Sequence, residues 1–157
     1  MRNLAELNLN EMGKRVERAA PTTEMVTIFE NEFSVTLPPE YINFLMYCNG
    51  GHPELNLVVP MRRTDIAALS VDHFFYLDED REGPLSLWAV ARAWRTSLGE
   101  KRIPIATDGG GNPFILDMSD SIPKVSICLH DEDFTVVEVA ASFSEFIDHL
   151  ELDPDMI

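Results

Sequence analysis

Residues 37–51, LPPEYINFLMYCNGG, carry the start, the buried face and the end of one predicted helix. Pro38 and Pro39 suit its first turn, where backbone amides have no partner and proline already holds a helical φ. Asn49 and Gly50 tolerate the left-handed backbone that closes a helix. The apolar positions on one face are Tyr41, Phe44, Leu45 and Cys48. We therefore predict a helix that is docked firmly in the core.

Three further helices are predicted around this segment, and a fourth with less regular spacing. Thr22 or Thr23 caps a helix that buries Val26, Phe29 and Phe33. Another helix runs from Ser86 to Gly99, with Trp88 about 60° off its apolar stripe and packed sideways. A capping box of Ser142 and Glu145 starts the last helix. Residues 1–20 are predicted to form a weakly patterned helix.

The second half of the chain predicts strands. Residues 102–107, 113–118, 124–129 and 135–140 are rich in Ile, Val, Phe and Thr, and turn-forming residues separate them. The order of elements predicts an α+β fold: a single domain with helices packed on a mostly antiparallel sheet and a C-terminal helix. We expect an N-terminal helical extension over residues 1–21 and the main domain over 22–157.

Composition limits the possible partners. The 157 residues include 12 basic and 27 acidic ones, for a formal net charge of -15. Such a charge disfavours nucleic acid and anionic membranes, and it speeds encounter with a basic protein, although solubility alone is an alternative reason for it. No apolar run approaches the ~20 residues of a membrane span, and residues 1–15 lack a signal-peptide pattern. We expect a cytoplasmic protein with Cys48 and Cys128 reduced and buried.

Two polar stretches are candidates for chemistry. Residues 107–114, TDGGGNPF, offer backbone amides to an anion, but a strand follows where a phosphate loop needs a helix, so a hairpin turn is favoured. Residues 130–133, HDED, hold possible ligands for Mg²⁺ or Ca²⁺, yet their spacing fits a solvated turn better. His52, His73 and His149 stand alone in the sequence, so we expect them to support no ligand set. We predict no catalytic residues, no metal and no cofactor.

Two motifs resemble the SMI1/KNR4 family, also called the SUKH superfamily. The first is residues 37–41 followed by Phe44-Leu45 and the Asn-Gly-Gly of residues 49–51. The second is Ile105-Ala106 with residues 108–112 and Leu116-Asp117. The likeness extends from about Thr22 to Leu150. The chain departs from the family pattern at Pro113 and in lacking an aromatic residue before His130.

The resemblance implies an α+β domain without known catalysis. Many bacterial members look like immunity proteins that neutralise polymorphic or contact-dependent toxins, often nucleases, and fungal relatives act as regulatory scaffolds of the cell wall. A nuclease toxin is typically basic, so an acidic inhibitor would gain a steered association rate. The expected contacts with the toxin are exposed loop residues: Asp78, Glu79, Asp80, Asp108, Asn112, Asp131, Glu132 and Asp133.

Two alternatives are open at this point. One is a scaffold or regulatory module that binds other proteins. The other is a small metal-dependent hydrolase with a carboxylate site between residues 78–80 and 130–133.

Overall fold

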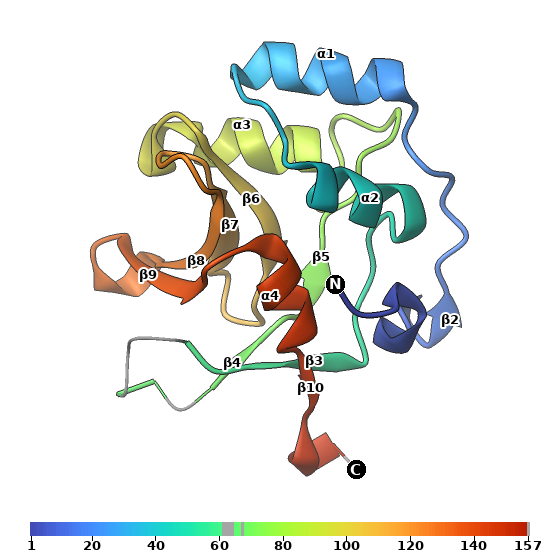
Figure 1. Cartoon of the computed structure of the whole chain (residues 1–157), viewed down its shortest axis with the longest axis vertical. Helices are drawn as coiled ribbons and strands as arrows, with labels where there is room; N and C mark the ends of the chain where they lie inside the picture. The colour runs from blue at the N-terminus through green and yellow to red at the C-terminus, as the bar shows by residue number, and fades with distance from the viewer. Residues whose placement is uncertain (61–64, 67, 157) are drawn as a thin grey trace.

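A computed structural model describes residues 1–60, 65–66 and 68–156 (Figure 1). Its helices are α1 (Thr23–Phe33), α2 (Pro39–Tyr47), α3 (Leu87–Leu98) and α4 (Phe143–Asp148), with short 3-10 helices η1 (Leu4–Leu7), η2 (His130–Glu132) and η3 (Pro154–Met156). Its strands are β1 (Asn10–Glu11), β2 (Lys14–Arg15), β3 (Leu55–Val58), β4 (Leu69–Ser70), β5 (His73–Phe74), β6 (Arg102–Thr107), β7 (Pro113–Asp117), β8 (Lys124–Leu129), β9 (Thr135–Ala140) and β10 (Glu151–Leu152). Residue 157, the expected end of the main domain, lies outside the described residues.

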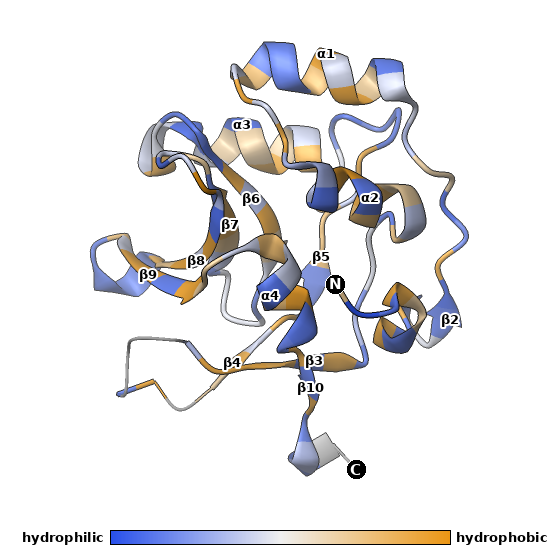
Figure 2. Cartoon of the chain, in the orientation of Figure 1, coloured by the Kyte–Doolittle hydropathy of each residue, from blue (hydrophilic) through white to orange (hydrophobic). Residues whose placement is uncertain are grey.

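The largest sheet has the order β5-β6-β7-β8-β9, and every neighbouring pair is antiparallel. The predicted meander and the α+β fold are thus confirmed. Two smaller antiparallel sheets have the orders β1-β2 and β10-β3-β4. Figure 2 shows β6 and β8 mostly in hydrophobic colours and the turns at the strand ends in hydrophilic ones. Most residues of β6, β7 and β8 are buried, whereas most residues of the turns that join them are exposed.

Helix α2 forms as its sequence predicts and joins the sheet to α4. Pro38 is the N-cap with an extended backbone, and Tyr41, Phe44 and Leu45 are buried. The Phe44 ring lies 4.8 Å from that of Phe74 on β5 and 5.2 Å from that of Phe143 on α4. Aromatic pairs at these separations add to the burial of apolar surface. The segment 37–51 is therefore the centre of the core.

Helices α1 and α3 pack against one another through aromatic rings. The Thr22 hydroxyl accepts a hydrogen bond from the Met25 amide, so the predicted cap is confirmed. Phe29 of α1 meets Trp88 of α3 edge to face at 5.1 Å. Trp88 is fully buried and its indole N–H donates to the Asp78 carbonyl at 3.1 Å. Its predicted sideways packing is confirmed.

The predicted helix over residues 1–20 is wrong. This segment contains η1 and the β1-β2 hairpin, whose turn places Met12 and Gly13 at positive φ. Asparagine side chains compete with a helix for the backbone: Asn3 accepts from the Ala5 amide, and Asn10 accepts from the Gly13 amide. The segment is nevertheless docked, because Leu7 is fully buried in the main core.

Asn49 differs from its predicted role. The residues with positive φ after α2 are Gly50 and Gly51, at 94° and 111°. Asn49 is instead buried, and its side chain connects two other segments of the chain. Its side chain accepts from the Leu77 amide at 2.8 Å and donates to the carbonyls of Leu77 and Ala19 at 2.9 and 2.8 Å. Sequence alone does not show this role, because the partners lie about thirty residues away on either side.

Candidate functional site

The sheet brings two acidic turns to one edge. Strands β6 and β7 pair Thr107 with Pro113, and β8 and β9 pair Leu129 with Thr135. The two connecting turns, residues 108–112 and 130–134, therefore leave the sheet at the same end of its strands. We call these two turns the acidic edge.

The first turn is built around one carboxylate. Asp108 accepts hydrogen bonds from the amides of Gly110 and Asn112 at 2.9 and 2.7 Å, and from the Asn112 side chain at 2.9 Å. Gly111 has a φ of 86°, which explains why glycine suits that position. The predicted hairpin turn is confirmed. These amides already donate hydrogen bonds to Asp108, so the structure does not support the alternative of a phosphate-binding loop.

The second turn is joined to the first by a side chain. The Asn112 amide oxygen accepts from the His130 backbone N–H at 3.0 Å. His130 Nε2 lies 3.1 Å from a carboxylate oxygen of Asp131, which is 89% exposed. Glu132 and Asp133 are exposed as well. The structure thus gathers Asp108, Asn112 and residues 131–133 of the predicted contact set.

Asp78, Glu79 and Asp80 lie elsewhere. Residues 75–77 lead the chain away from the acidic edge, to a loop beside the N-terminal end of α3 (Figure 1). Asp78 binds the Arg18 guanidinium at 3.1 Å. The Tyr76 hydroxyl, followed by the amides of residues 82 and 83, holds the pKa of Asp80 below its usual value. Internal bonds therefore occupy two of these carboxylates.

This separation also bears on the hydrolase alternative. Its carboxylates were expected to come from residues 78–80 and 130–133 together, and the fold does not bring these two groups to one place.

Burial raises the pKa of the Cys48 thiol to about 12 and also raises that of Cys128. Both cysteines are free and buried, as predicted, so little thiolate is present near neutral pH.

An aromatic residue at the acidic edge was missed by the sequence analysis. Phe134 is 47% exposed and its ring meets that of Trp94 at 6.2 Å. Asp133 and Phe134 both have positive φ, 54° and 58°, which is an unfavourable conformation for a phenylalanine. The only signal in the sequence was an aromatic residue inside an otherwise polar turn. The acidic edge therefore combines carboxylates with one exposed ring.

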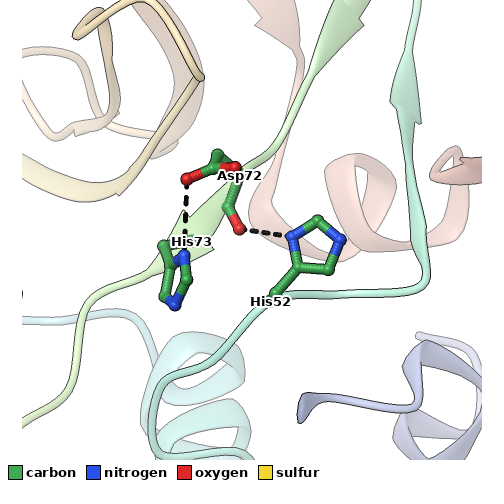
Figure 3. Close-up of side chains that lie close together, drawn as sticks. All are labelled: His52, Asp72 and His73. Atoms are coloured by element: carbon green, nitrogen blue, oxygen red, sulfur yellow. Dashed lines mark hydrogen bonds and ion pairs between the residues drawn. The ribbon is translucent and has the colours of Figure 1, made fainter. Parts of the chain in front are cut away.

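The prediction that His52 and His73 are isolated is wrong. One ligand atom from each of His52, Asp72 and His73 lies within 4.8 Å of the others (Figure 3). His149 is exposed and its Nδ1 lies 4.0 Å from Glu145. Sequence could not reveal the histidine pair, because twenty-one positions separate its members and the contact depends on strand pairing.

Comparison with known proteins identifies one family. The family model of SMI1 / KNR4 (SUKH-1) matches residues 20–149, which is most of the chain. A search of curated proteins gives no match. Within the described residues, no helix has the length and apolar character needed to cross a membrane.

Proposed function

Since the chain belongs to the SMI1/KNR4 family (SUKH-1), we propose that it is a non-catalytic immunity protein that binds and neutralises a cognate protein toxin. Family membership is consistent with an immunity kind of role. The observation that carries the proposal further is the acidic edge, where the exposed carboxylates of residues 131–133 and the exposed ring of Phe134 lie in one turn.

The chemistry of this edge fits a basic partner. Its carboxylates lie on turns, and hydrogen bonds hold these turns in shape before any partner arrives. Preorganised groups lose less conformational entropy on binding. The net charge of -15 adds a long-range field that attracts a basic surface. A nuclease toxin presents such a surface where it binds phosphates, so we propose a nuclease as the target and the cytoplasm as the place of action.

Phe134 gives the edge an anchor. Aromatic residues are enriched among the few positions that supply most of the binding energy of an interface. Carboxylates around such a residue contribute to orientation and association rate more than to affinity. The proposed interface therefore has an apolar centre and a charged rim.

The test is to express the proteins encoded by the neighbouring open reading frames, to find one that arrests growth, and to express that candidate toxin with and without this protein. We expect co-expression to restore growth, the two proteins to copurify in equal amounts, and the isolated toxin to lose its activity when one equivalent is added. Copurification with cellular signalling proteins and no effect on the toxin would support the scaffold alternative. Growth arrest despite a folded, abundant protein would refute the immunity role.

A further inference from the structure

His52 and His73 face one another across two paired segments. Gly51 and Phe74 exchange both of their backbone hydrogen bonds, at 3.3 and 2.9 Å. His52 and His73 are the next residues along this antiparallel pairing and are directly opposite, where side chains approach most closely. Their ring centroids are 6.2 Å apart. On its other side, His52 exchanges backbone hydrogen bonds with Asn10 at 2.7 and 3.0 Å.

Asp72 supplies a carboxylate at the same place. Its amide donates to the Thr107 carbonyl at 2.8 Å, which fixes it at the end of β6. Its Oδ2 lies 3.4 Å from His73 Nδ1, and its carbonyl accepts from His52 Nδ1 at 2.6 Å (Figure 3). Strand pairing on both sides therefore fixes the backbones from which all three side chains extend.

We propose that His52, Asp72 and His73 bind a divalent transition-metal ion, with Zn²⁺ as the ion that fits best and water as the fourth ligand. Two imidazoles and one carboxylate suit Zn²⁺, whereas Mg²⁺ and Ca²⁺ prefer oxygen ligands alone. Two ligands at about 2.1 Å from a tetrahedral ion lie about 3.4 Å from each other. The separation of His73 Nδ1 and Asp72 Oδ2 already has this value.

His52 and His73 both have to change tautomer for this site to form. The carbonyl and the carboxylate of Asp72 only accept hydrogen bonds, so each imidazole carries its proton on Nδ1 before a metal binds. The other nitrogen of His52, Nε2, points away from Asp72 and His73 (Figure 3). Metal binding moves the proton of each ring from Nδ1 to Nε2 and turns the two Nδ1 lone pairs towards the ion. The three ligand atoms, which lie within 4.8 Å of one another, then have to move closer together, which rotation of the partly exposed rings allows.

Titration with Zn²⁺ and Co²⁺ tests the proposal. We expect one equivalent of Zn²⁺ to bind, Co²⁺ to give the intense visible absorption of a tetrahedral complex, and Zn²⁺ to raise the midpoint of thermal unfolding. His52→Ala and His73→Ala should each weaken binding at least tenfold, and Asp72→Asn should also weaken it. His149→Ala is the matched control and should bind as the unmodified protein does. Circular dichroism checks that each variant is folded.

Nitrogen NMR of the imidazoles gives a second readout that does not depend on substitution. With Zn²⁺ bound, the signals of His52 and His73 should both change from the Nδ1–H to the Nε2–H tautomer. The proposal is overturned if no one-to-one binding is found, or if Zn²⁺ binds equally well after both histidine substitutions.

Discussion

The side-chain amide of Asn112 joins the two turns of the acidic edge: its oxygen accepts from the His130 backbone at 3.0 Å, while its nitrogen donates to Asp108 at 2.9 Å. One residue thereby fixes the position of the Asp108 carboxylate relative to the turn that carries the carboxylates of residues 131–133.

Replacing this residue should loosen the edge. Asn112→Ala leaves the His130 amide without its acceptor, and we expect the free energy of unfolding to fall by about 1–2 kcal/mol. Hydrogen exchange at residue 130 should accelerate. Gly109→Ala is the control in the same turn, because its added Cβ meets nothing within 4 Å and its φ is not positive. Equal stability of the two variants would contradict this role of Asn112.

Neutralising the second turn should slow association with a basic toxin. We expect Asp131→Asn, Glu132→Gln and Asp133→Asn together to lower the association rate constant while stability changes little, since exposed charges contribute mainly to the field. Raising the salt concentration from about 0.05 to 0.5 M should have a similar effect on the unmodified protein, because the Debye length falls from roughly 14 to 4 Å. Surface plasmon resonance measures both effects.

The control for this experiment changes the net charge equally at other sites. Glu24→Gln, Glu100→Gln and Asp120→Asn remove three exposed charges outside the acidic edge. This variant should retain most of the association rate. If both triple variants and high salt leave the rate unchanged, the acidity serves solubility and the interface lies elsewhere.

Phe134 should matter for binding more than for folding. Asparagine tolerates the left-handed backbone of this position better than phenylalanine does. In Phe134→Asn, relief of that strain offsets the lost contact with Trp94, so the free energy of unfolding should change by less than about 1 kcal/mol. Toxin affinity should fall at least about tenfold. Ile122→Asn, at another exposed apolar side chain, is the control and should bind normally.

Phe44 should be a main determinant of stability. Phe44→Ala leaves a cavity among the rings of α2, α4 and β5, at an expected cost of about 3–5 kcal/mol. Tyr47→Ala, on the exposed face of the same helix, should cost far less. Urea denaturation compares the two midpoints, and coincident midpoints would show that α2 is not central to the core.

Glu40, on the same helix, contributes to stability through its hydrogen bonds with α4. Its carboxylate accepts from the Phe143 amide at 3.2 Å and from the Ser144 hydroxyl. From the sequence alone, Glu40→Gln is expected to cost less than about 1 kcal/mol, as for most surface changes. Since hydrogen bonds to charged groups are stronger than neutral ones, the structure raises the expected cost to about 1–2 kcal/mol.

Asp117 should make stability depend on pH in the acid range. Burial favours a higher pKa, but the hydrogen bonds from Ser119 and the charge of Arg102 outweigh it and lower the pKa below the usual 3.8. A carboxyl whose pKa is lowered by folding stabilises the protein above its unfolded pKa, and this contribution is lost as pH falls through the folded pKa. Asp117→Asn should therefore be less stable at pH 7 and lose less stability between about pH 4 and pH 2. Asp120→Asn, at an exposed position, should keep the slope of the unmodified protein.

The sequence by itself determined the local elements of this protein. Prolines at the start of α2, the cap at Thr22 and the β-branched runs of β6, β8 and β9 act through neighbours in the chain, so their signals lie within a few residues. The burial of Phe44 also follows from its spacing on the apolar face of α2, and that of Trp88 from the size of its side chain. The prediction of a helix over residues 1–20 was wrong because hydrogen bonds between asparagine side chains and the backbone competed with a weakly patterned helix.

Only the tertiary structure decided which polar residues meet. Strand register placed the turns at 108–112 and 130–134 on one edge and set His52 opposite His73, and neither fact has a signature in nearby sequence. The role of Asn49 could not be predicted from the sequence for the same reason. An asparagine before two glycines can close a helix or, as here, form hydrogen bonds to two distant segments, and the local sequence is the same in both cases. Propensity depends on adjacent residues, whereas a site depends on contacts between segments that chain folding brings together.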